Sequence, residues 1–396
     1  MDNLKFYTKQ DLDETSYYKD LINQPGWKRC YYKPNPDNPH RSKSNHRKTD
    51  KETGITHYLY ISLFDNIPVK HSFYLSSFEI FFGRGNIFSP DHKNISYLEN
   101  KIIKSMLNVG IKYPGEIELT GFDFDINVKF KNSKDMEIVK ESLINNLNWN
   151  KIRPTNIYDT ANGFGVYNRS SLKKIGLLVY DKQMQLKSKD IHSDTSVAEN
   201  CLRWSYRING PSAMQSVFRC KTLPFDALLV ELFNYNIIRV FEKRLNELGI
   251  FKGAKIVTKD TLRKVIKENS NRKNGKYPAL DDLRNIMKCR KNLSPNRRKR
   301  LKDKCKNNGI CFTWVKDVCN REIYLHDMVI EELKLVLEGR SEFSYKETIK
   351  PDNATWFRDE KKLFCQEVQP PVVVTNQEAP SLFGRYMLYK QGERWA

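Results

Sequence analysis

The sequence lacks three patterns that would place the protein in a simple class. Its apolar runs reach only about six residues, as in Ile175–Tyr180, which is too short to cross a bilayer. Its eight cysteines include no Cys-x-x-Cys pair, so neither a zinc framework nor a disulfide framework is indicated. The segment Met1–Tyr18 is charged rather than apolar. We therefore expect no transmembrane span, no signal peptide and reduced cysteine thiols.

Acidic residues are also few relative to basic ones. The 396 residues include 47 Asp and Glu against 68 Lys and Arg, which gives a formal net charge of +21. Such a balance indicates a polyanionic partner, with nucleic acid first and an anionic membrane second. The length is sufficient for two or three domains with cores of their own.

The excess positive charge is concentrated in two stretches. Residues 252–306 hold 20 basic and 5 acidic residues, residues 28–52 hold 8 and 3, and the other 316 residues are nearly neutral. The stretch 28–52 is rich in Pro, Asn, Ser and Lys, which predicts a mobile surface loop. The stretch 252–306 has apolar residues at helical spacing, which predicts short amphipathic helices with basic outer faces. A solvated face or a nuclear-targeting signal are alternatives, but the charge density favours a nucleic-acid contact surface.

The first 220 residues alternate between segments rich in β-branched and aromatic residues and amphipathic segments. We predict strands near 55–64, 70–82, 116–130, 163–167, 175–180 and 202–208, and helices at 96–107 and 134–147. This order predicts an α+β fold, in which helices cover one face of a largely antiparallel sheet and the other face is free for a ligand. From Pro224 the pattern becomes mainly helical.

Acidic residues follow one face of the predicted strand 116–130. Asp123 and Asp125 occupy alternate positions and so project from the same face, and Glu79 lies in another strand. Adjacent carboxylates repel one another unless a cation lies between them, and hard divalent ions prefer carboxylate oxygens. These residues predict a site for Mg²⁺ or Mn²⁺. The alternative is a solvated polar face of a surface strand.

Two further strands carry residues suited to phosphate chemistry. Tyr180 ends an apolar strand, and the charge of Lys182 would favour its phenolate form. Arg203 and Arg207 alternate with apolar residues, and guanidinium groups bind phosphate in a bidentate manner. The alternatives are a tyrosine at the edge of the core and arginines paired with acids on neighbouring strands. A metal, a phosphate clamp and a nucleophile together would suit phosphodiester transfer.

The succession of these motifs resembles the gene II/X replication initiators of filamentous phages. The similarity covers residues 78–229 and begins with FEIFFGRGNIFSPD at 78–91. It continues through the aspartate strand FDFDINV, then LLVYDK at 177–182, LRWSYRI at 202–208 and the turn LPFDA at 223–227. Each motif is short, so the specificity of the resemblance comes from their order.

The resemblance implies a rolling-circle initiator, an enzyme that nicks the viral strand at the origin and later rejoins the displaced strand. It assigns the nucleophile, which forms a 5′-phosphotyrosine intermediate, to Tyr180, with Lys182 assisting. It assigns metal binding to Asp125, with Asp123 in place of the family's arginine. The implied partners are duplex origin DNA, displaced single-stranded DNA, and the host helicase and polymerase, in the host bacterial cytoplasm and without a membrane.

This interpretation divides the chain into four regions. They are an N-terminal extension with the basic flexible loop (1–54), a nicking domain (55–222), a helical basic DNA-binding domain (223–340) and an extended Pro-containing tail (341–396). The expected DNA-binding residues are Asn86, Arg203, Arg207, Arg297, Arg298, Lys299 and Arg300.

The sequence also departs from the family. Ser205 replaces the glutamate of the family's R-x-E-x-R strand, and the turn Arg84-Gly85-Asn86 lacks the family's histidine. His57 and His71 are separate in sequence, and we expect them to be structural. Two other functions stay open, namely a non-enzymatic origin-binding regulator and a related plasmid relaxase or transposase.

Overall fold

The computed structural model describes thirteen stretches of the chain. They are residues 2–9, 15–33, 43–62, 69–77, 92–113, 115–149, 154–157, 165–170, 175–188, 195–225, 231–287, 293–318 and 322–344. The protein is α+β with a mostly antiparallel open sheet, which confirms the predicted class.

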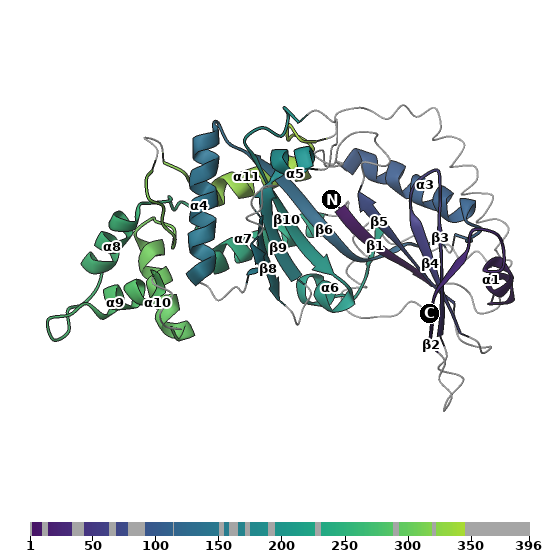
Figure 1. The fold of residues 1–396 in the computed structure, drawn as a ribbon, viewed down its shortest axis with the longest axis horizontal. Coiled ribbons are helices and arrows are strands. Elements are labelled where there is room, and N and C mark those ends of the chain that lie inside the picture. Colours follow the sequence, from purple (N-terminus) through teal and green to yellow (C-terminus); the bar gives the residue numbers. More distant parts are fainter. Residues whose placement is uncertain are drawn as a thin grey trace, which may run out of the picture. The chain divides into compact units, whose positions relative to one another are not determined.

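The strands follow one another along the sheet in the order β2-β3-β4-β5-β1-β6-β10-β9-β8-β7, and β11 pairs with β6. Their bounds are β1 (Asp2–Lys9), β2 (Lys28–Lys33), β3 (Lys43–Thr49), β4 (Thr56–Ser62), β5 (Lys70–Ser77), β6 (Glu118–Lys129), β7 (Pro154–Ile157), β8 (Gly165–Ser170), β9 (Ile175–Asp181), β10 (Cys201–Asn209) and β11 (Leu223–Pro224). The helices are α1 (Thr15–Leu21), α3 (His92–Asn108), α4 (Ser133–Trp149), α5 (Lys182–Ser188), α6 (Pro211–Phe218), α7 (Glu231–Leu248), α8 (Lys259–Glu268), α9 (Pro278–Met287), α10 (Pro295–Asn307) and α11 (Leu325–Leu337) (Figure 1).

The chain divides into two compact units, and each is assembled from separate stretches. The first unit comprises Met1–Phe124, Ile208–Asn234 and Ser344–Ala396, and the second comprises Asp125–Arg207 and Tyr235–Phe343. The division falls inside β6, β10 and α7 and after Phe343, so it lies close to the predicted boundary at 340 but does not follow those at 54 and 222. Helices α8–α11 belong to the second unit together with β7–β9. A separate helical DNA-binding domain stays a prediction.

Residues 28–52 do not form the continuous loop that their composition predicts. Lys28 pairs with Arg47 across β2 and β3, and Thr49 pairs with Thr56 across β3 and β4, both antiparallel. The side chains of β2 and β3 show little alternation of apolar and polar residues. Backbone hydrogen bonds to neighbouring strands, rather than a buried apolar face, therefore hold these strands in the sheet. Residues 34–42 lie outside the described part of the chain.

The first unit contains a buried chain of polar side chains beneath α3. The Thr8 hydroxyl lies 2.8 Å from His71 Nδ1, His71 Nε2 lies 3.1 Å from His57 Nδ1, and His57 Nε2 lies 2.9 Å from the Ser105 hydroxyl. All four residues are buried. Buried polar groups require such partners, so the two histidines hold strands β1, β4 and β5 and helix α3 in one arrangement. This geometry agrees with their expected structural role.

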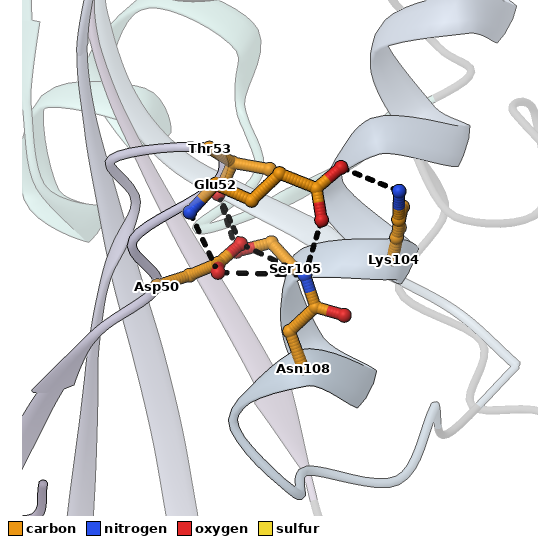
Figure 2. Close-up of polar contacts among 6 residues, drawn as sticks. All are labelled: Asp50, Glu52, Thr53, Lys104, Ser105 and Asn108. Atoms are coloured by element: carbon orange, nitrogen blue, oxygen red, sulfur yellow. Dashed lines mark hydrogen bonds and ion pairs between the residues drawn. The ribbon is translucent and has the colours of Figure 1, made fainter.

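The series of buried polar contacts continues from Ser105 through Thr53 to the carboxylate of Asp50 (Figure 2). The Thr53 hydroxyl donates to Asp50 Oδ2 at 2.6 Å and lies 2.8 Å from the Ser105 hydroxyl. Asn108 reaches both Asp50 and Glu52, and Lys104 pairs with Glu52. Burial opposes the charge of Asp50, but hydrogen bonds led by that of Thr53 outweigh it and lower the pKa of Asp50. Because an ionised carboxylate only accepts hydrogen bonds, it fixes the direction in which the hydroxyls donate.

Because His57 and His71 are buried, we predict that acid destabilises the folded state. Burial lowers the pKa of His57 to about 3 and the pKa of His71 well below its usual value, and His57 adds to the shift of His71. Both pKa values are lower in the folded state than in the unfolded state. The contribution of the two histidines to the unfolding free energy is therefore complete above about pH 6.5, and it is lost as the pH falls toward their folded-state pKa values. Each should steepen the pH dependence of the unfolding free energy by about 1.4 kcal/mol per pH unit between roughly pH 6 and 4.

Urea unfolding over this pH range measures that slope. We expect the slope of the variant His57→Phe to fall by about 1.4 kcal/mol per pH unit relative to the unaltered protein. An unchanged slope would contradict the neutral buried state of His57. His46, whose pKa burial and Arg29 also lower, adds to the slope in both proteins and cancels in the comparison.

The second unit packs helices against β10, β9 and β8. β8 and β9 pair antiparallel, with Gly165 opposite Tyr180. The Tyr206 ring on β10 lies 5.5 Å from the Phe241 ring on α7, so α7 covers the apolar face of that strand. In the stretches that the structure describes, no helix combines the length and the apolar character needed to cross a bilayer.

Candidate functional site

Three adjacent strands of the second unit carry residues predicted for phosphate chemistry. In the order β6-β10-β9, these strands supply Asp125, then Arg203 and Arg207, then Tyr180. Fold topology therefore brings together strands that lie up to 82 positions apart in the sequence (125 to 207). Asp123 precedes Asp125 on β6 in the first unit. Glu79 and Asn86 lie outside the described residues.

The polar face of β6 and β10 is covered rather than open. Asp123 is 3% exposed, Asp125 is 2% exposed and Arg203 is 1% exposed. The Arg203 Nε–H donates to Asn127 Oδ1 at 3.1 Å, so a guanidinium from β10 lies on the side chains of β6. The expectation that this face is free for a ligand is therefore wrong. Strand alternation shows which side chains share a face, but it does not show whether other elements cover that face.

Tyr180 is the next-to-last residue of β9, and Asp181 separates it from α5. Its side chain is half-buried. Asp181 accepts the backbone N–H of Met184 at 3.0 Å, which caps the first turn of α5. Lys182 is fully buried and donates to Gln185 Oε1 at 2.8 Å. Burying an ammonium group requires such partners, because desolvation of a charge is costly.

Asp181 also forms a shielded ion pair that sequence reasoning missed. Lys140 on α4 lies 2.9 Å from Asp181, whose side chain is 5% exposed. Burial opposes the charge on Lys140, but hydrogen bonds to Asp181 and Glu137 outweigh it and raise the pKa of Lys140. The pair ties α4 to the residue that follows Tyr180. An aspartate directly before a helical segment is the sequence signal that could have indicated this cap.

Charges of both signs act on the buried thiol of Cys201, the first residue of β10. Burial raises its pKa to about 12, and the cations Arg203 and Lys182 oppose that rise while Glu332 and Glu342 add to it. Four charged side chains of both signs therefore contribute to the electrostatic field at the start of β10. Glu332 accepts a hydrogen bond from Ser341, and burial is the main cause that raises its pKa. The two predicted site cations, Arg203 and Lys182, are both buried.

The described residues do not make up the predicted cation site. Among them, no group of three or more His, Cys, Asp or Glu side chains could hold a metal ion. Asp123 and Asp125 supply two carboxylates, and the third predicted ligand, Glu79, lies outside the described residues. Mg²⁺ usually needs carboxylates in open geometry with several waters, which strands this buried do not offer.

Helices α8, α9 and α10 form a compact basic group in the second unit (Figure 1). Their apolar residues meet inside the group, where Leu262, Leu283 and Leu301 are almost completely buried. The sequence prediction of short amphipathic helices in 252–306 is confirmed. Many of the cations of the group are exposed, among them Lys264, Lys267, Lys299 and Arg300, as an electrostatic contact surface requires.

The four predicted DNA-binding residues on α10 differ in their surroundings. One edge of the Arg297 guanidinium, formed by Nε and Nη2, donates to both carboxylate oxygens of Asp282 on α9, with Nε 2.9 Å from Oδ2. Arg298 is half-buried, and burial lowers its pKa. Lys299 and Arg300 are exposed. Arg297 therefore links two helices, and contact with DNA stays a prediction for all four.

Positive charge on α10 is crowded enough to affect a neighbouring lysine. Burial and then the nearby Arg298 lower the pKa of Lys302 to about 8, although Glu247 opposes the shift. The Lys302 ammonium donates to the backbone carbonyl of Glu247. A phosphate beside this helix would add negative charge to α10, in which Asp303 is the one acidic side chain.

Arg297 and Lys299 should respond differently to substitution. Arg297→Gln removes the partner of the buried Asp282, so we expect a loss of about 1–3 kcal/mol in unfolding free energy. Lys299→Gln should stay within about 0.5 kcal/mol of the unaltered protein, because the side chain is exposed. Chemical denaturation measures both. Equal effects of the two substitutions would contradict the linking role of Arg297.

Comparison with known proteins provides no relative. No family model, curated protein or solved structure matches the chain. The resemblance to phage replication initiators therefore depends on its short motifs alone.

Proposed function

We propose that the protein is a replication initiator of the rolling-circle type, which nicks one strand of phage origin DNA and later rejoins the displaced strand. The observation that carries this proposal is the order β6-β10-β9, which assembles Asp125, Arg203, Arg207 and Tyr180 on neighbouring strands. The same unit contains the basic group α8–α10. A nucleophile, phosphate-binding cations and a duplex-binding surface are the parts that this activity needs.

In this proposal Tyr180 performs the covalent step. Its phenolate oxygen forms a bond with the phosphorus of the scissile phosphodiester, and the bond from phosphorus to O3′ breaks. The 3′ oxygen takes up a proton, and the 5′ end stays attached as a phosphotyrosine. Attack by a later 3′-hydroxyl reverses the exchange, so no nucleotide hydrolysis is required.

The surroundings of Tyr180 support this role. It lies where a strand meets a helix, and the cap at Asp181 and the pair with Lys140 hold that junction in place. Lys182 is buried and directed toward Gln185, so its proposed role is to add positive charge near the phenol rather than to exchange protons with solvent. Arg207 is less buried than Arg203, which makes it the better candidate for contact with DNA phosphate.

One observation favours a second function. The burial of Asp123, Asp125 and Arg203 is also what a purely structural layer would show. In that case the protein is a non-enzymatic DNA-binding regulator, and only the basic group α8–α10 acts. A plasmid relaxase or transposase would share the chemistry of the first proposal, with a different DNA partner.

A nicking assay distinguishes these functions. The protein is incubated with supercoiled plasmids that carry candidate phage origins, in the presence of Mg²⁺, Mn²⁺ or EDTA. Relaxed circles together with a protease-sensitive adduct on the 5′ end would support the initiator, and the three conditions measure the cation requirement. Salt-sensitive DNA binding without any strand scission would support the regulator and overturn the initiator.

A further inference from the structure

A tight basic turn connects α8 to α9. Lys273 and Lys276 exchange two backbone hydrogen bonds of 2.9 Å each, and the residues between them are Asn274 and Gly275. Their φ angles are 47° and 72°. Positive φ at both central residues defines a type I′ turn, which Asn-Gly favours strongly. The backbone of this turn is therefore well determined by its own sequence.

The turn presents cations and no opposing charge of its own. Arg272, Lys273 and Lys276 are exposed, and no Asp or Glu occurs from Asn269 to Leu280. Elsewhere in the group, arginines on α8 and α9 pair with aspartates on the same helix, as Arg263 does with Asp260 at 3.3 Å. Three like charges on one short turn repel one another, and either salt ions or a bound polyanion reduces that repulsion.

The chemistry of the turn distinguishes between polyanions. It has no exposed apolar residue for insertion into a bilayer, and Tyr277, at its base, is half-buried with the Lys267 ammonium 5.8 Å from its ring. It therefore lacks the aromatic platform on which single-stranded bases stack. A rigid, narrow turn with guanidinium and ammonium groups suits the phosphate-lined groove of a duplex.

We propose that the turn Arg272–Lys276 enters a groove of duplex DNA and forms a contact separate from that of α10. This inference rests on the proposed DNA-binding function and adds to it the element that reads duplex shape. Asn274 and Gly275 set the conformation, and the three cations contact phosphates on both sides of the groove.

The test measures binding of the full-length protein to duplex DNA across a series of salt concentrations. Replacing Arg272, Lys273 and Lys276 together with Gln should lower duplex affinity about 100-fold at physiological salt and reduce the salt slope by about 3. The matched control replaces three exposed lysines outside the group, Lys131, Lys134 and Lys334, and should change affinity only a few-fold.

A second variant changes the backbone conformation of the turn without changing its charge. A Cβ atom on Gly275 would meet no atom within 4 Å, so Gly275→Val acts only through the backbone, which a branched residue does not adopt at positive φ. We expect a several-fold loss of duplex affinity with the cations intact. Circular dichroism and melting confirm that α8–α10 are folded in each variant.

The outcomes separate the two proposals. If the unaltered protein binds duplex DNA and the turn variants bind equally well, this inference is wrong and the proposed function stands. If the unaltered protein does not bind duplex DNA, both fail. Equal affinity of Gly275→Val and the unaltered protein would rule out a shape-dependent contact. Loss of binding to phosphatidylserine vesicles, with duplex binding intact, would assign the turn to a membrane and overturn the inference.

Discussion

Replacing Tyr180 with Phe should abolish formation of the covalent DNA adduct and of relaxed circles. The substitution removes one oxygen and keeps the ring, so the packing at the end of β9 changes little. Without the phenolate no bond to phosphorus can form, and we expect activity to fall by at least about 10⁴-fold, as is typical when a nucleophile is lost. The assay is the nicking of supercoiled origin plasmid.

The control is a tyrosine of the same unit with no expected chemical role. Tyr235 on α7 is 61% exposed, and Tyr235→Phe should leave nicking unchanged. Duplex binding by Tyr180→Phe should also stay unchanged, because the basic surface is intact. If Tyr180→Phe still forms the adduct, the nucleophile has been misassigned.

Replacing His57 with Phe should destabilise the first unit by about 1.5–4.5 kcal/mol. The substitution leaves His71 Nε2 without the partner on that side, which costs about 1–3 kcal/mol. The Ser105 hydroxyl loses one hydrogen bond, worth about 0.5–1.5 kcal/mol, but keeps its contact with Thr53. Phe is close in size to His and retains ring contact with Phe73, whose centroid lies 5.4 Å away. Urea unfolding measures the loss.

A double-mutant cycle separates the hydrogen bond from packing. Combining His57→Phe with Ser105→Ala removes both partners of one contact, so the combined loss should be smaller than the sum of the single losses by about 1–2 kcal/mol. Additive losses would indicate that the 2.9 Å contact contributes little.

Segments with a regular apolar period were predictable from the sequence. The alternation in FDFDINV indicated β6, and helical spacing indicated α3, α4 and most of α7. β2 and β3 were missed because neighbouring strands stabilise them through backbone hydrogen bonds, which leave no side-chain pattern. The same limit applies to the buried histidine chain, since its members come from four separate elements.

The candidate site was predictable only in part. Alternation predicted that Arg203, Ser205 and Arg207 share one face of their strand, but it does not indicate that Arg203 is covered and bonded to Asn127 on β6, 76 positions away. The ion pair between Lys140 and Asp181 joins residues 41 positions apart, which no local pattern indicates. The Asn-Gly turn after α8, in contrast, had a clear local signal in the dipeptide itself.

The division of the chain inside β6 and β10 has a practical consequence for protein engineering. Neither unit corresponds to one uninterrupted segment of the polypeptide, because each strand begins in one unit and ends in the other. A C-terminal truncation at either strand would remove residues of both units at once. Expressing one unit alone would require an internal deletion that joins its separate segments through a new linker.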